Sequence, residues 1–239
     1  MLHPRLSFRI PGGRALRPLL VAAPPPRAII ADTLLTSGSS TTDGSSVSTA
    51  VISPVAGWPI YAAFVSAVTG GPNIPAASGN GLVWTVRSTL VLPGNARRLT
   101  VFEAIGSAPT TGPVTADFGG QAQTSFAWSI IQCTNADAGP VQIATNLASG
   151  ATTIVATLAA LEHERNLALV FVALANNTAV TPDPNFAERS DDTVANQGAA
   201  LECETAVNRT ICAPTFAAAS AGIVAIEVKS APPVRRTQL

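Results

Sequence analysis

Side chains that could do chemistry are few in this sequence and widely spaced. Only two histidines, His3 and His163, could act as general bases, and no serine lies in a Gly-x-Ser-x-Gly nucleophile motif. Glu202 and Glu204 alternate along an expected strand, so their carboxylates share one face about 7 Å apart. A solvated face explains this pair better than a glycosidase site does, because both acids lie on one strand instead of facing across a cleft. The sequence therefore predicts no catalytic residues and a protein that is not an enzyme.

Metal and phosphate motifs are also weak. The segment 162–164 (Glu-His-Glu) contains metal-ligating residue types without a second cluster, which favours a solvated turn. Asp183, Asp191 and Asp192 could bind calcium if their loop folds back, but their spacing is not that of a calcium loop. No phosphate loop, metal-finger spacing or RNA-binding aromatic signature is present. We therefore expect no metal, no cofactor and no nucleic-acid partner.

Three cysteines are too few for a disulfide scaffold. Cys133 lies in an apolar run and is expected to be a buried small hydrophobe. Cys203 and Cys212 flank an expected hairpin turn at 208–209. A two-residue loop would set them diagonally on one face and a four-residue loop directly opposite, so a disulfide between them is left open.

Aromatic side chains suggest a second class of function, sugar binding. Trp58, Tyr61 and Trp84 could stack on a glycan, as aromatic residues do in carbohydrate-binding modules. Only 5% of the residues are aromatic, and most lie in apolar segments. Packing in the core is therefore the favoured interpretation of these three residues.

Charge is distributed unevenly although the net charge is zero. Residues 1–31 contain no acid, whereas residues 32–234 hold all 14 acidic residues. Such separation favours an arm that docks on something acidic. The arginines expected to bind a partner are Arg5, Arg9, Arg14, Arg17, Arg27, Arg235 and Arg236.

Composition predicts an all-β fold. Charged residues make up 12% of the chain, and its 18 glycines and 19 prolines favour short strands and tight turns over helices. No apolar run approaches 18 residues, so no membrane span is expected. The run Leu19–Ala23 is too short for a signal sequence, and three prolines follow it.

A duplicated hairpin organises the body. Residues 84–105 recur, weakened, as residues 186–207, at a constant offset of 102 and without a gap. Both copies have an apolar entry, a Gly/Asn turn region and a second alternating run, which is the pattern of a β-hairpin. The matching pairs are Trp84 with Phe186, Arg87 with Arg189, Ser88 with Ser190, Leu99 with Leu201, Ala104 with Ala206, and Ile105 with Val207.

The flanking segments extend this repeat to five elements in the same order. The apolar run 166–174 matches 61–68, and the last runs, 210–216 and 223–229, match 114–118 and 126–132. We expect residues 1–46 to form an extended arm and linker, 47–230 a body, and 231–239 a basic tail. Because no linker separates the halves, we favour one jelly-roll-like sandwich whose facing sheets come from the two sets of strands.

The order of segments in the body resembles a β-sandwich module of tailed-bacteriophage virion proteins and bacterial surface proteins. Trp84-Thr85 after a Gly/Pro loop, the run Val101-Phe102 and the apolar strand 127–133 carry this resemblance, over roughly residues 47–230. It implies a multi-copy, non-enzymatic virion protein, displayed as a capsid decoration or tail component. Other virion proteins are the implied partners, bound through the arm. A carbohydrate- or receptor-binding jelly roll is the alternative.

Overall fold

The structure is a computed structural model that describes residues 26–195 and 198–232. Those residues form 16 β-strands. They contain no helix, and therefore none that could cross a membrane. The all-β fold class predicted from composition is confirmed.

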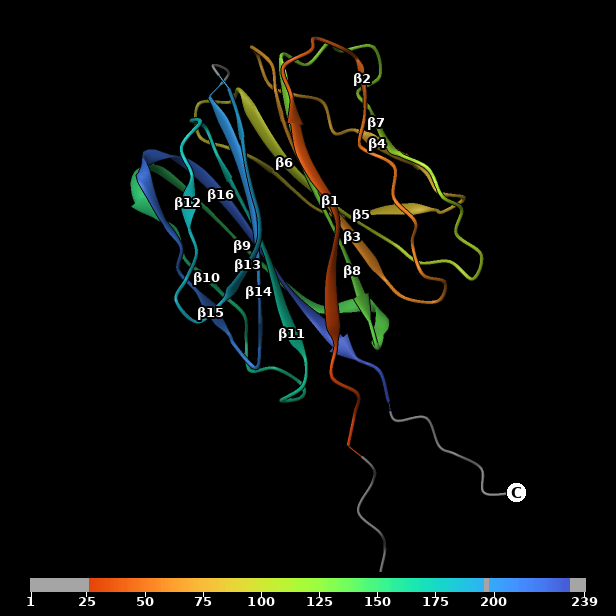
Figure 1. Ribbon diagram of the computed structural model, residues 1–239. Helices are drawn as coiled ribbons and strands as arrows, with labels where there is room; N and C mark the ends of the chain where they lie inside the picture. The colour runs from red at the N-terminus through yellow and green to blue at the C-terminus, as the bar shows by residue number, and fades with distance from the viewer. Residues whose placement is uncertain (1–25, 196–197, 233–239) are drawn as a thin grey trace, which may run out of the picture.

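The first eight strands form a large and a small antiparallel sheet (Figure 1). The first large sheet has the order β1-β8-β3-β6-β5, and the first small sheet has the order β2-β7-β4. The strands are β1 (Ala31–Ser40), β2 (Ser46–Ser48), β3 (Ile60–Ala67), β4 (Ala76–Gly79), β5 (Trp84–Val91), β6 (Arg97–Ala104), β7 (Val114–Asp117) and β8 (Ser125–Thr134).

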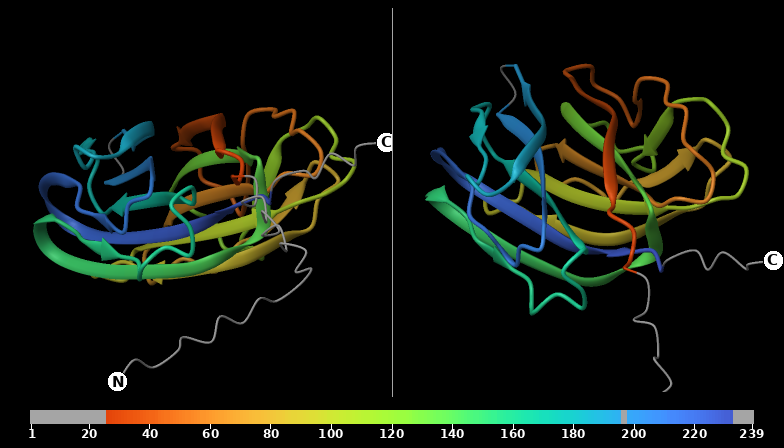
Figure 2. Two further views of the ribbon diagram at one scale, coloured as in Figure 1. Left: turned by 90° about the horizontal axis from the view of Figure 1, so that it is seen from below. Right: turned by 60° about the horizontal axis from the view of Figure 1, so that its bottom comes forward.

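The last eight strands repeat this arrangement. In the second large sheet β9, β16, β11, β14 and β13 are neighbours in that order, β12 pairs with the start of β16, and β10 pairs with β15. Figure 2 shows β9 (green) alongside β16 (blue). The strands are β9 (Ala136–Thr153), β10 (Ala156–Thr157), β11 (Leu167–Leu174), β12 (Val180–Thr181), β13 (Ala187–Val194), β14 (Ala199–Val207), β15 (Ile211–Cys212) and β16 (Thr215–Ser230).

Strand pairing shows the duplication directly. β1 pairs with β8, β2 with β7 and β3 with β6, while β9 pairs with β16, β10 with β15 and β11 with β14. These three pairings of the second half reproduce those of the first, whereas β4 pairs with β7 and its counterpart β12 pairs with the start of β16. The predicted hairpins are β5–β6 and β13–β14, and each contains a bulge at the same place. The extra residue is Arg87 in one and Arg189 in the other, which confirms the predicted pairing of these arginines.

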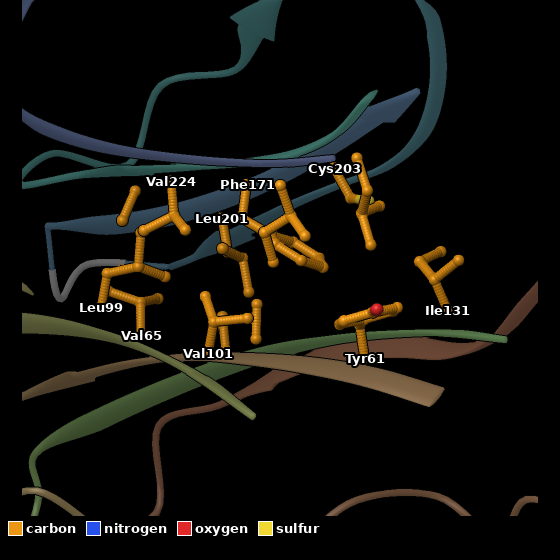
Figure 3. Close-up of a cluster of buried hydrophobic side chains, with 14 of the residues drawn as sticks. Tyr61, Val65, Leu99, Val101, Ile131, Phe171, Leu201, Cys203 and Val224 are labelled. Carbon is orange, nitrogen blue, oxygen red and sulfur yellow. The ribbon is translucent and has the colours of Figure 1, made fainter. Parts of the chain in front are cut away.

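The two large sheets pack face to face across a central core. Side chains from β3, β6 and β8 meet side chains from β11, β14 and β16, as Figure 3 shows for Tyr61, Val101, Phe171 and Leu201. Each of these four residues is at most 1% exposed. The expectation that the two halves supply facing sheets is thus confirmed.

Each large sheet also has a buried outer face. In the first half, Phe64, Phe102 and Phe126 pack under β2, β4 and β7 in a second core. In the second half, Val170, Val172 and their neighbours form a third core with β10 and β15. The molecule therefore has three cores rather than the single core of one sandwich, and this explains why β3 and β11 are buried at every position.

One expectation about the segments differs from the structure. Residues 31–40, assigned to the arm and linker, form β1 at the edge of the first large sheet. The predicted boundary at residue 47 is therefore too late, since Ile30 already lies in the central core, 4% exposed.

The central core should dominate stability. Phe171→Ala removes a fully buried ring from the contact between the large sheets and should lower the free energy of unfolding by about 3–5 kcal/mol. Chemical denaturation at 25 °C measures the loss. The exposed control Val51→Ala should change it by less than about 0.5 kcal/mol, and equal effects of the two variants would contradict the assigned core.

Candidate functional site

The bulge in β5 places Arg87 against Glu103, which lies near the end of β6 on the inner face of the same sheet. Arg87 Nε donates to Glu103 Oε2 at 2.6 Å, and the Tyr61 hydroxyl donates to Glu103 Oε1 at 3.3 Å. Glu103 is 3% exposed, whereas the Arg87 side chain is one-third exposed. Burial and the neighbouring Glu103 raise the pKa of Tyr61 well above its usual value, so its hydroxyl stays a donor.

Glu103 also connects the two large sheets. The Gly139 N–H at the start of β9 donates to Glu103 Oε1 at 2.8 Å. Gly139 has φ of 79°, a backbone conformation that glycine adopts without strain. An open pocket of about 240 Å³ lies beside this contact, lined by Val83, Thr85, Arg87, Glu103, Ala104, Ile105, Ala138 and Gly139.

The bulge in β13 places Arg189 in a related contact with a different acid. Arg189 Nε donates to Asp32 Oδ2 of β1 at 2.6 Å and lies 2.9 Å from Thr205 Oγ1. Thr205 occupies the position that Glu103 has in the first half, at the offset of 102 residues. The acid that binds Arg189 therefore comes from the other large sheet, whereas the acid that binds Arg87 comes from its own hairpin. The Arg189–Asp32 contact joins the two large sheets, whereas Arg87 and Glu103 lie in the same sheet.

A second polar feature, which we call the acidic block, lies on the outer face of the second large sheet. It consists of Glu188 and Asp191 on β13 and Glu202 and Glu204 on β14. Glu188 pairs directly with Glu204, and Asp191 pairs directly with Glu202. Like charges directly opposite on neighbouring strands repel each other.

The surroundings of the block satisfy only some of its oxygens. The backbone N–H of Asp183 and the Cys212 thiol donate to Glu204 at 2.9 and 2.7 Å, and the Val180 N–H donates to Asp191 Oδ2 at 3.0 Å. Both carboxylate oxygens of Glu202 and Oδ1 of Asp191 are buried without a hydrogen-bond partner among the described residues.

Burial shifts the protonation of the block. Burial, and then the neighbouring carboxylates, raise the pKa of Glu202 well above its usual value. Burial likewise raises the pKa of Glu204 to about 7 and that of Asp191 to about 6. Asp183 differs: burial alone would raise its pKa, but hydrogen bonds from Asn185 and Ala213 and the charge of Arg209 lower it.

The prediction that Glu202 and Glu204 share one face is confirmed, and the prediction that this face is solvated is wrong. Both residues are 0% exposed. The alternation of acids along β14 resembles a solvent-facing strand, but the outer face of this sheet is covered by the segments that contain β12 and β15.

Most of the predicted arm lies outside the described residues. This holds for Arg5, Arg9, Arg14, Arg17, Arg235 and Arg236, while Arg27 is described. Arg27 Nη1 donates to the Ser230 carbonyl at 2.8 Å, and Arg165 Nη1 donates to the Arg27 carbonyl at 2.6 Å.

The proposed glycan-stacking residues do not form a common surface. Tyr61 is 0% exposed in the central core, so its ring cannot stack on a sugar. Trp84 is half-buried, packs against the first half's outer core and donates from Nε1 to the Gly79 carbonyl at 3.4 Å. Trp58 is also half-buried.

The cysteines are free and buried. Cys203 lies in the central core and Cys212 in the outer core of the second half, on opposite faces of the sheet, so the disulfide considered between them is not present. Burial raises the pKa of all three thiols. Cys133 is buried as predicted.

Removing the cation beside Glu103 should be costly. Arg87→Met leaves a buried carboxylate without its ion pair and should lower the free energy of unfolding by about 2 kcal/mol or more. The double variant Arg87→Met/Glu103→Gln should recover most of this loss, because it removes the unpaired charge and keeps an amide oxygen that can accept from Tyr61 and Gly139. Urea denaturation of both, with the exposed Arg209→Met as control, tests this; equal losses for Arg87 and Arg209 would refute it.

The buried Glu202 makes stability depend on pH. Because the folded state holds the Glu202 proton more tightly than the unfolded chain, stability is greatest below the usual pKa of a glutamate and falls as the pH rises. Glu202→Gln, a neutral isostere, should raise the free energy of unfolding at pH 8 by about 1–3 kcal/mol and leave it nearly unchanged at pH 4.

Denaturation of both proteins at the two pH values measures this effect. Glu162→Gln is the matched control, since the Glu162 side chain is 55% exposed and should show little effect at either pH. A Glu202→Gln variant that is destabilised equally at pH 4 and pH 8 would show that the carboxylate is ionised in the fold.

Comparison with known proteins identifies no relative of this chain: no protein-family model matches it, and neither curated proteins nor solved structures contain a match.

Proposed function

We propose that the chain is a non-enzymatic structural protein of a tailed-phage or phage-like virion, present in several copies and anchored to capsid or tail proteins by its basic ends. One observation carries the proposal. The two ends of the body are hydrogen-bonded to each other, Arg27 to the Ser230 carbonyl and the Ala28 N–H to the Ala231 carbonyl at 3.4 Å. Figure 1 shows β1 and β16 leaving the body at the same end.

The shared exit point matters because it lets the positive charges of the two chain ends act on the same partner surface. The arginines at 5, 9, 14 and 17 precede this point, and those at 235 and 236 follow it. Arginine suits such an anchor, since its guanidinium pairs with carboxylates in interfaces. A body whose large sheets are buried on both faces would be a stiff base for the anchor.

We further infer that each half is a jelly roll. That fold results when a long antiparallel ribbon of eight strands, its first strand paired with its last, rolls up into two sheets. The pairs β1 with β8, β2 with β7 and β3 with β6 follow this rule, and β4 lies against β5. Jelly rolls are common in viral capsid proteins, which supports a virion role.

Deleting residues 1–25 should abolish incorporation into the particle and leave the fold intact. The deletion must stop at 25, because Ile30 belongs to the central core. We expect the copy number per purified particle, measured by quantitative mass spectrometry, to fall at least tenfold while the deleted protein keeps its all-β circular-dichroism spectrum. The matched variant Arg235→Gln/Arg236→Gln tests the tail separately. Full occupancy of the deleted protein would refute anchoring by the arm.

A further inference from the structure

The acidic block has no cation of its own in the described part of the chain. No ion pair joins Glu188, Asp191, Glu202 or Glu204 to a basic side chain there. Three buried oxygens of the block have no donor either, two on Glu202 and one on Asp191. Glu202 is 0% exposed and lies between its two acidic neighbours, Asp191 and Glu204. Its carboxyl group has no hydrogen-bond partner among the described residues.

The first half shows that the fold does not require these acids. At the offset of 102 residues, Val86, Thr89, Thr100 and Phe102 occupy the positions of Glu188, Asp191, Glu202 and Glu204. None of these four residues is charged, and Phe102 packs in the outer core of its half. The block is therefore an addition to the second half that stability does not explain.

Guanidinium groups fit this block better than a metal ion does. Among residues 26–195 and 198–232, no three acids, histidines or cysteines are arranged to hold a metal ion. A guanidinium has five donors in a plane and can serve two carboxylates at once. Glu188 is exposed and Asp191 half-buried, so an arginine can approach the block from that side.

The chain itself supplies such arginines within reach. Residues 1–25 contain four arginines and no acid. The chain that follows them is fixed at Arg27, beside Ser230 of β16. β13 lies three strands from β16, about 14 Å across the sheet, and the register sets Glu188 level with Ala225, five residues before Ser230 and so about 17 Å along the strand. The ten residues from Arg27 back to Arg17 can span up to about 33 Å, so Arg17 and Arg14 can both reach the block.

We propose that the acidic block on β13 and β14 is the docking site for the arginine-rich residues 1–25 of the same chain in the free protein. The block holds the arm until a more acidic partner displaces it. This interaction surface goes beyond the proposed virion role and does not depend on which particle the protein joins.

A spin label placed in the arm of the full-length protein tests the docking. Ile10→Cys puts the label between Arg9 and Arg14, and the three native cysteines, at most 2% exposed, should not react. At low salt and pH 8, amide signals of residues 188–191 and 202–204 should lose at least about half their intensity. The loss should weaken in 1 M salt, where screening acts beyond about 3 Å, and at pH 5, which lies below the raised pKa values of Asp191 and Glu204, so that these two carboxyl groups lose most of their charge.

Variants and a mixing experiment decide the outcome. Glu188→Gln/Asp191→Asn should restore the signals, whereas Asp43→Asn/Asp117→Asn, which removes two exposed acids elsewhere, should not. No signal loss at low salt, or a loss that survives Glu188→Gln/Asp191→Asn, would overturn the proposal. In the mixing experiment, one copy carries the spin label and no NMR isotopes, and the other carries the isotopes and no spin label. The same signal loss in this mixture would also overturn the proposal, because the arm would then bind a neighbouring molecule. Particle incorporation is measured separately, so failure here leaves the virion proposal standing.

Discussion

Face-to-face packing of the two large sheets is the constraint on which the rest of the structure depends. Each large sheet must be apolar on its inner face to meet the other, and apolar on its outer face to support its own half. Its central strands therefore have no solvated face. The polar groups that remain inside must find partners there. The Gln132 side chain on β8 hydrogen-bonds both the N–H and the carbonyl of Val55. The Glu227 carboxylate on β16 accepts from the side-chain amides of Gln142 and Asn166 and from the backbone N–H of Glu162.

Duplication explains how this packing arose with matching polar links, and divergence explains how the links differ. Both hairpins retain a bulge arginine; Arg189 joins the two large sheets, while Arg87 pairs with Glu103 of its own sheet, and Glu103 in turn reaches β9. The acids differ, however: Arg87 binds Glu103 on β6, and Arg189 binds Asp32 on β1. Because Glu103 supplies the charge within its own hairpin, β9 needs only the Gly139 N–H at this contact, and the open pocket lies beside it.

Sequence reasoning succeeds here where a pattern is local. The constant offset of 102 residues predicts the two hairpins because no insertion disturbs their bulges. It fails where a tertiary contact overrides composition. β1 is rich in serine and threonine because it is a half-exposed edge strand, and such a sequence is hard to tell from a linker. Glu202 and Glu204 alternate like solvated residues, and only the cover on that sheet face buries them.

The exit of the arm determines how strong any docking must be. Arg27 is held by Ser230 and Arg165, so the arm starts from a fixed point. A random coil of ten residues has a root-mean-square span of about 17 Å, against a separation of about 22 Å from Ser230 to Glu188, about 14 Å across the sheet and about 17 Å along it. A tether whose span is comparable to the separation gives effective concentrations in the millimolar range. Contacts that would be weak between separate molecules are then sufficient, and an external partner must offer a higher density of acids to release the arm.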